Sequence, residues 1–122
     1  MVLNFDSEIP IYVQIAEGIE NAILAGTLDI EAQIPSTTEI SIMYKINPAT
    51  ALKGVNLLVD EGVVYKKRGL GMFVSEGAKE KILQKRKQVF FESYVLKLIS
   101  EAKKLSITPQ EIDEMIKRGF EQ

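Results

Sequence analysis

The strongest constraint on this chain's fold lies in residues 35–74, where two short helices and a hairpin follow one another almost without linkers. Ser36 and Glu39 have the spacing of a capping box, which predicts the start of a helix. Asn47-Pro48 predicts the start of a second helix, because Asn caps helices well and Pro suits the first helical position. Gly62 is placed to end that second helix.

Two strand-like segments then flank a basic turn. Residues 63–65 and 72–74 read Val-Val-Tyr and Met-Phe-Val, which favour β-strands. Residues 66–71 between them read Lys-Lys-Arg-Gly-Leu-Gly. The order of helix, turn, helix and hairpin is that of a winged helix-turn-helix, which presents its second helix to the DNA major groove.

The remaining chain also reads as helix. Isoleucines recur every four residues from Ile11 to Ile23, which predicts a first helix over residues 11–25. Residues 78–104 read as one long helix, and Thr108 with Glu111 forms a second capping box that opens a last helix. We therefore predict an α+β chain. Residues 1–76 form a winged helix-turn-helix DNA-binding domain of three helices and a two-stranded wing, and residues 77–122 form a two-helix dimerisation region.

Composition excludes several kinds of site. The 122 residues contain neither His nor Cys, which removes imidazole bases, thiolate nucleophiles and the usual zinc sites. We therefore expect no enzymatic activity, no metal and no cofactor. No apolar run approaches about 18 residues and the start lacks the pattern of a signal peptide, so we expect a cytoplasmic protein without a membrane partner.

The charge distribution leaves two functions open. Residues 1–77 hold ten acidic and five basic side chains, whereas residues 78–122 hold seven acidic and ten basic ones. Any DNA affinity of the first part must therefore come from a local basic cluster, since phosphate neutralisation supplies most non-specific binding. The alternative is a winged-helix protein-interaction module without DNA-binding activity.

The chain resembles the GntR superfamily of bacterial transcription regulators over residues 10–74. The resemblance rests on the order and spacing of short fragments, which are Pro10-Ile11-Tyr12, Gln14-Ile15, Gly26, Pro35-Ser36, Glu39, Thr50, Glu61-Gly62 and Arg68-Gly69-Leu70-Gly71-Met72-Phe73-Val74. Most members add a large effector-binding domain, but only 45 residues follow Gly77 here. This short tail resembles the YtrA-type subfamily, whose members dimerise through two C-terminal helices and commonly repress operons for ABC-type transporters.

Two positions depart from the family pattern. The family usually has Arg where this chain has Thr38, and that Arg typically contacts DNA. A polar residue often stands where Leu52 lies. Losing these donors removes base or phosphate contacts, so the operator sequence of relatives does not transfer to this chain.

Candidate DNA-binding residues lie in three places. The start of the second helix-turn-helix helix offers residues that reach base edges in such folds, and the wing tip offers cations for phosphate. The start of the preceding helix completes the predicted set, which is Ser36, Thr38, Asn47, Ala49, Thr50, Lys53, Lys66, Lys67, Arg68, Gly69 and Gly71. Capping by Ser36, Asn47 and Thr50, a solvated Lys53 and an ordinary soluble hairpin tip are the simpler readings.

The second predicted site is a dimer interface. Residues 89–99 are apolar on more than one helical face, which is more than one monomer of this length buries easily. We predict that Phe90, Tyr94, Leu98 and Ile116 lie at the interface, the alternative being a pocket for a small molecule. The predicted function is thus a homodimeric repressor that binds an inverted repeat in double-stranded DNA, and the residues specify no small-molecule effector.

Overall fold

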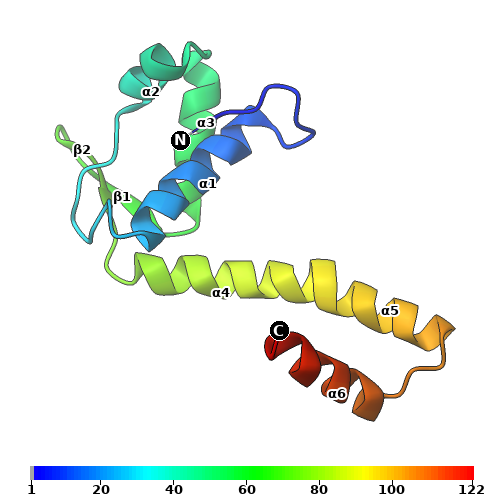
Figure 1. The fold of residues 1–122 in the computed structure, drawn as a ribbon. Helices are drawn as coiled ribbons and strands as arrows, with labels where there is room; N and C mark the ends of the chain where they lie inside the picture. Colours follow the sequence, from blue (N-terminus) through cyan, green and yellow to red (C-terminus); the bar gives the residue numbers. More distant parts are fainter. Residues whose placement is uncertain (1) are drawn as a thin grey trace. The chain divides into compact units, whose positions relative to one another are not determined.

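The computed structural model describes residues 2–122, which form two compact units divided between Gln84 and Lys85. The first unit contains the three predicted helices and the predicted two-stranded wing (Figure 1). Its elements are α1 (Ile11–Leu24), α2 (Thr37–Tyr44), α3 (Pro48–Asp60), β1 (Val64–Lys67), β2 (Gly71–Val74) and the first turns of α4 (Ala78–Phe90). The winged helix-turn-helix prediction is confirmed.

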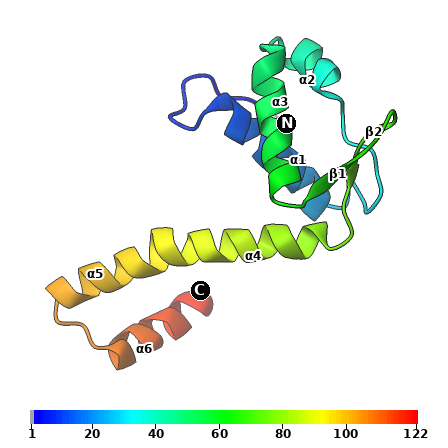
Figure 2. The same cartoon turned by 180° about the vertical axis from the view of Figure 1, so that it is seen from behind.

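The core of the first unit forms where α1 crosses α3 (Figure 2). Ile15 of α1 is fully buried, and Val55 and Leu58 of α3 are almost fully buried against it. Gly54 makes this crossing close, because a Cβ atom there would lie 2.8 Å from the carbonyl oxygen of Tyr12. The four-residue isoleucine spacing of α1 thus marks the face that α3 covers.

The wing is an antiparallel hairpin in which Tyr65 pairs with Phe73 and Lys67 pairs with Gly71. A segment that precedes α2, residues 31–34, runs along the outer edge of β2. Its backbone bonds are Glu31 N to Val74 O at 2.9 Å, Ile34 N to Met72 O at 3.0 Å and Val74 N to Ala32 O at 2.9 Å. The sequence gives no sign of this pairing, because four residues are too few to show strand periodicity.

The second unit continues α4 through a π-helical turn, η1 (Phe91–Val95), into α5 (Leu96–Lys104). The predicted helix over residues 78–104 is therefore helical throughout, but one wide turn interrupts its α-helical geometry. A connection through Ser106 leads to α6 (Pro109–Phe120), which begins with the predicted capping box of Thr108 and Glu111. No residue of α6 is buried.

The compact units do not divide at the residue where the sequence places a domain boundary. Ala78 and Ile82 of α4 are buried in the core of the first unit, so the first unit extends beyond the wing into α4. The functional division between residues 76 and 77 stays a prediction, because it concerns what each part binds.

Candidate nucleic-acid interface

The start of α3 is open and well capped. The Asn47 side chain accepts a hydrogen bond from the backbone N–H of Ala49 at 2.8 Å, and Pro48 occupies the first helical turn. Asn47, Ala49 and Lys53 are exposed, whereas Thr50 is half-buried. The predicted capping role of Asn47 is therefore confirmed. The other predicted residues here, Ala49, Thr50 and Lys53, lie on the first turns of the same helix.

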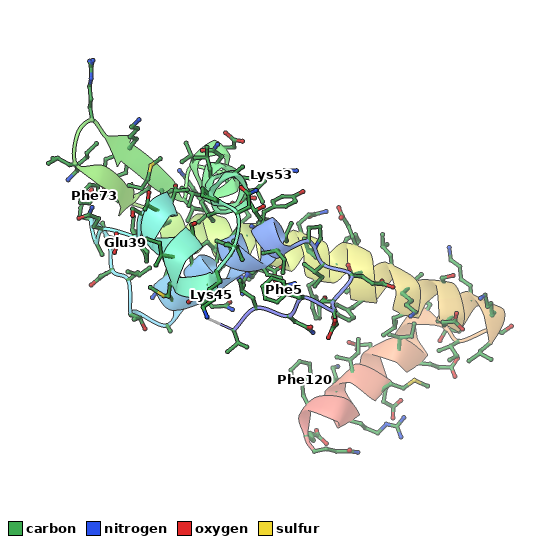
Figure 3. All side chains as sticks on the ribbon, turned by 90° about the horizontal axis from the view of Figure 1, so that it is seen from above. Phe5, Glu39, Lys45, Lys53, Phe73 and Phe120 are labelled. Carbon is green, nitrogen blue, oxygen red and sulfur yellow. The ribbon has the colours of Figure 1, made fainter. Side chains whose placement is uncertain are left out.

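Lys53 is held against α1. Its ammonium nitrogen lies 4.1 Å from the centre of the Tyr12 ring, which is a cation–π arrangement. Figure 3 shows Lys53 on α3 and Lys45 in the turn between α2 and α3. Tyr12 was not among the residues proposed from the sequence as part of the site, because its contact with Lys53 depends on the crossing of two helices.

The start of α2 carries a complete capping box. The Ser36 hydroxyl accepts from the backbone N–H of Glu39 at 3.0 Å, and the Glu39 carboxylate accepts from the backbone N–H of Ser36 at 3.1 Å. The bond from the Ser36 backbone N–H contributes most to holding the pKa of the Glu39 carboxyl below its ordinary value, and the Ser36 side chain lowers it further. Thr38 is exposed beside them. Ser36 therefore caps α2 while it remains at a surface position.

The turn between α2 and α3 adds an exposed cation. Lys45 adopts a left-handed backbone conformation with φ of 54° and ends α2, and its backbone N–H donates to the carbonyl of Ser41. The hydroxyl of Ser41 donates to the carbonyl of Ile46 at 3.0 Å, which fixes the turn. Lys45 was not among the DNA-binding residues predicted from the sequence, although basic residues are scarce in this part of the chain.

The wing tip is a tight turn closed by a hydrogen bond from Leu70 N to Lys67 O at 2.9 Å. Gly69 and Gly71 have φ values of 76° and 123°, a region that favours glycine. The Gln33 side chain donates to the Leu70 carbonyl at 2.9 Å, and a Cβ atom on Gly71 would lie 2.6 Å from the Gln33 amide nitrogen. Both glycines thus allow the backbone of the turn, and Gly71 also leaves space for the Gln33 side chain.

The three wing cations have different surroundings. Lys66 and Arg68 are exposed, whereas Lys67 is half-buried. Lys67 Nζ lies 3.2 Å from a carboxylate oxygen of Glu31 and 4.4 Å from the centre of the Phe73 ring. The predicted basic cluster therefore consists of two exposed cations, Lys66 and Arg68, and a third, Lys67, that forms an ion pair with Glu31.

The predicted interface residues of the second unit are open to solvent. The exposed fractions are 58% for Phe90, 65% for Tyr94, 42% for Leu98 and 45% for Ile116. The rings of Phe90 and Tyr94 lie 5.4 Å apart, and Leu98 and Ile116 line one apolar groove between α5 and α6. Large apolar side chains exposed in such a cluster are typical of an interaction surface.

Within residues 2–122, no group of three acidic side chains is placed to hold a metal ion. None of the helices in that range is both long enough and apolar enough to cross a membrane.

Comparison with known proteins decides the family. Residues 11–74, from the start of α1 to the end of the wing, match the bacterial regulatory proteins of the gntR family. The chain belongs to this family. It is 37% identical to the transcriptional repressor NagR of Bacillus subtilis over 69% of its own length, but it spans about a third of that protein, 35%. It is 29% identical to the transcriptional repressor YtrA of Bacillus subtilis, covering 91% of this chain and 85% of YtrA.

Solved structures of the gntR family share the fold. A protein assigned to the GntR family, from Bacteroides thetaiotaomicron, superposes with a TM-score of 0.78 at 34% identity, covering 91% of this chain and 96% of that one. The DNA-binding domain of AraR, solved in complex with an operator, matches 62% of this chain and 90% of that domain, with a TM-score of 0.54 and 28% identity. This gntR-family chain is a DNA-binding transcription regulator.

Proposed function

We propose that the chain acts in the cytoplasm as a homodimeric repressor that binds an inverted-repeat operator. The observation that supports this most is the exposed, capped start of α3, together with two exposed cations on the wing of the same unit. In winged helix-turn-helix proteins such a helix start reads base edges while the wing binds the flanking backbone. Ser36, Thr38, Asn47, Ala49, Thr50, Lys53, Lys66, Lys67, Arg68, Gly69 and Gly71 are the proposed DNA-binding set.

The proposed dimer forms through the second unit. Phe90, Tyr94, Leu98 and Ile116 present apolar surface that another copy of the chain would cover. Two copies place two α3 helices in successive major grooves, so that the half-site centres lie about 10 base pairs apart or a multiple of that distance. Dimerisation raises affinity because the second half-site then binds intramolecularly.

Repression follows from occupancy. A dimer on an operator that overlaps a promoter blocks polymerase sterically, and this role needs no catalytic group, metal or cofactor. NagR and YtrA are both named as transcriptional repressors, which supports repression over activation for this chain. An operon for a transporter is the proposed target, on the resemblance to the YtrA-type subfamily.

A mobility-shift experiment tests the proposal. Purified protein is titrated onto its own promoter DNA and onto a random duplex of equal length, at low and at moderate salt. We expect tighter binding to the promoter and a loss of affinity with salt on both duplexes, because phosphate contacts release counterions. Equal binding to both duplexes would refute an operator.

The protein-interaction module remains the competing function, favoured by the acidic balance of residues 1–77. The interaction module predicts no retardation of either duplex at moderate salt. The same titration therefore separates the two functions, and the salt series guards against weak charge-driven association of the basic second unit with any DNA.

A further inference from the structure

Glu31 connects the segment before α2 to one face of the wing. Its carboxylate accepts a hydrogen bond from the Tyr65 hydroxyl, and the same oxygen lies 3.2 Å from Lys67 Nζ. Tyr65 and Lys67 are two residues apart on β1, so their side chains lie on the same face of the hairpin. The Phe73 ring lies on that face too and approaches the Lys67 ammonium group to 4.4 Å.

The backbone of Glu31 occupies a conformation that disfavours any side chain. Its φ is 69°, in the left-handed region where glycine is the residue with least strain. Strain of this kind persists only when surrounding contacts determine it, and it gathers at functional positions. Here the N–H of Glu31 bonds the Val74 carbonyl at 2.9 Å, and the side chain gains Tyr65 and Lys67. Glycine would adopt this conformation with less strain, but it would lack the side-chain contacts with Tyr65 and Lys67.

The Glu31 contact also changes the electrostatics of the wing. The hydrogen bond from Tyr65, and then Lys67, hold the pKa of Glu31 below its ordinary value. Glu31 in turn raises the pKa of Lys67. Both groups are therefore charged at neutral pH and neutralise each other locally. A DNA phosphate would have to displace a carboxylate before it could bind Lys67.

The two neighbouring cations have no such competitor. Among the described residues, Lys67 is the one wing cation that forms an ion pair, and Lys66 and Arg68 are exposed on either side of it. Lys66 lies one residue from Lys67 on β1 and so faces the opposite side of the hairpin. Their charges are free to replace counterions on a DNA backbone.

We propose that Glu31 is a positioning residue of the DNA interface, which holds Lys67 as an internal partner and leaves Lys66 and Arg68 to bind phosphate. The proposal rests on the proposed DNA-binding function. Within the proposed DNA-binding set it gives Lys67 a supporting role, whereas the sequence alone treated the three cations equally.

Salt dependence of binding to a random duplex tests the assignment of the cations. Lys66→Gln, Lys67→Gln and Arg68→Gln each remove one positive charge from the same hairpin. Each lost phosphate contact should reduce the slope of log affinity against log salt by about one. We expect that reduction for Lys66→Gln and for Arg68→Gln, and an unchanged slope for Lys67→Gln. A reduction in Lys67→Gln equal to that in Lys66→Gln overturns the proposal.

Substitutions at Glu31 test the converse. Glu31→Gln removes the charge and keeps the backbone strain, whereas Glu31→Gly removes both. Both should free Lys67 and steepen the salt slope by about one. Glu76→Gln is the matched control, because it removes an exposed acidic charge just beyond the wing without freeing a cation. Glu31 variants that behave like Glu76→Gln in slope contradict the proposal.

A measurement without DNA separates this inference from the proposed function. The hydrogen bond to Glu31 raises the pKa of the Tyr65 phenol. Ultraviolet titration should therefore show one tyrosine that ionises late in the wild type and earlier in Glu31→Gln. Identical titrations refute the contact. A late tyrosine together with no DNA binding by the wild type would refute the proposed function, and the role of Glu31 at a DNA interface with it.

Discussion

The ammonium nitrogen of Lys53 on α3 lies 4.1 Å from the centre of the Tyr12 ring on α1. A side chain of α3, the helix proposed to read DNA, is thus held by α1, which packs against α3. A cation over an aromatic face at an exposed site is worth about 0.5–1 kcal/mol, so the contact fixes the Lys53 side chain more than it stabilises the fold.

Replacing Tyr12 should weaken DNA binding through Lys53. We expect Tyr12→Leu to reduce operator affinity roughly 2- to 5-fold, the equivalent of one exposed cation–π contact. Tyr12→Phe retains the ring face and should bind as the wild type does. Fluorescence anisotropy with labelled operator measures both variants, and an equal loss in both would point to the hydroxyl instead.

Thr50→Ala tests sequence reading by α3. If Thr50 contacts a base, the variant should lose on the order of 1 kcal/mol on the preferred site and much less on random DNA, where phosphate contacts remain. Selection from a random library should return an inverted repeat. An equal loss on every sequence would make Thr50 a structural residue of the helix start.

Tyr94→Glu combined with Leu98→Glu should dissociate the proposed dimer. Burying two unpaired carboxylates in an apolar interface is costly, so sedimentation velocity at micromolar concentration should show a monomer. Ser100→Glu is the control, because Ser100 lies on the polar face that Lys97 and Lys104 share at helical spacing. A monomeric wild type at that concentration would remove the dimer from the proposed function.

Gly54→Ala should destabilise the first unit although Ala normally favours helices by about 1 kcal/mol over Gly. The added Cβ would lie 2.8 Å from the Tyr12 carbonyl and 3.1 Å from the Ile15 side chain, so α1 and α3 must separate. We expect a loss of about 1–3 kcal/mol in urea unfolding. Gly119→Ala meets no atom within 4 Å and should cost nothing.

Lowering the pH should remove the contribution of Glu39 to the stability of the fold. Because the folded state depresses the pKa of Glu39, its carboxylate stabilises the fold above its ordinary pKa of 4.5 and loses this effect as pH falls through the lower folded value. The stability difference between wild type and Glu39→Gln should therefore be full at neutral pH and shrink below about pH 4.5. A difference that stays constant down to pH 3 would show that the capping box does not depend on charge.

Features fixed by local chemistry were predicted from the sequence. Ser36 with Glu39, Asn47-Pro48 and Thr108 with Glu111 each start a helix through contacts within three residues. The hairpin was also predicted, because two apolar segments flank a glycine turn. Such signals lie within a few neighbouring residues, so one sequence suffices to find them.

Contacts between distant segments were not predictable in this way. Glu31 meets Tyr65 and Lys67 across more than thirty residues, and Gln33 meets Leu70 across a similar separation. A polar residue in a loop carries no sequence pattern that names its partner. The π-helical turn was missed too, since no pattern in residues 91–95 distinguishes a π turn from an α-helical one.

That turn, η1, affects how the second unit should be aligned with other chains. Each residue of an α-helix advances by about 100°, and a π turn is the usual result of one residue inserted into such a helix. Side chains after Val95 are therefore rotated relative to an unbroken α-helix that starts at Ala78. In a homologue that lacks the extra residue, the aligned partner of Leu98 should be found by placing a one-residue gap within residues 91–95. Without that gap, the alignment would equate apolar and polar faces of α5.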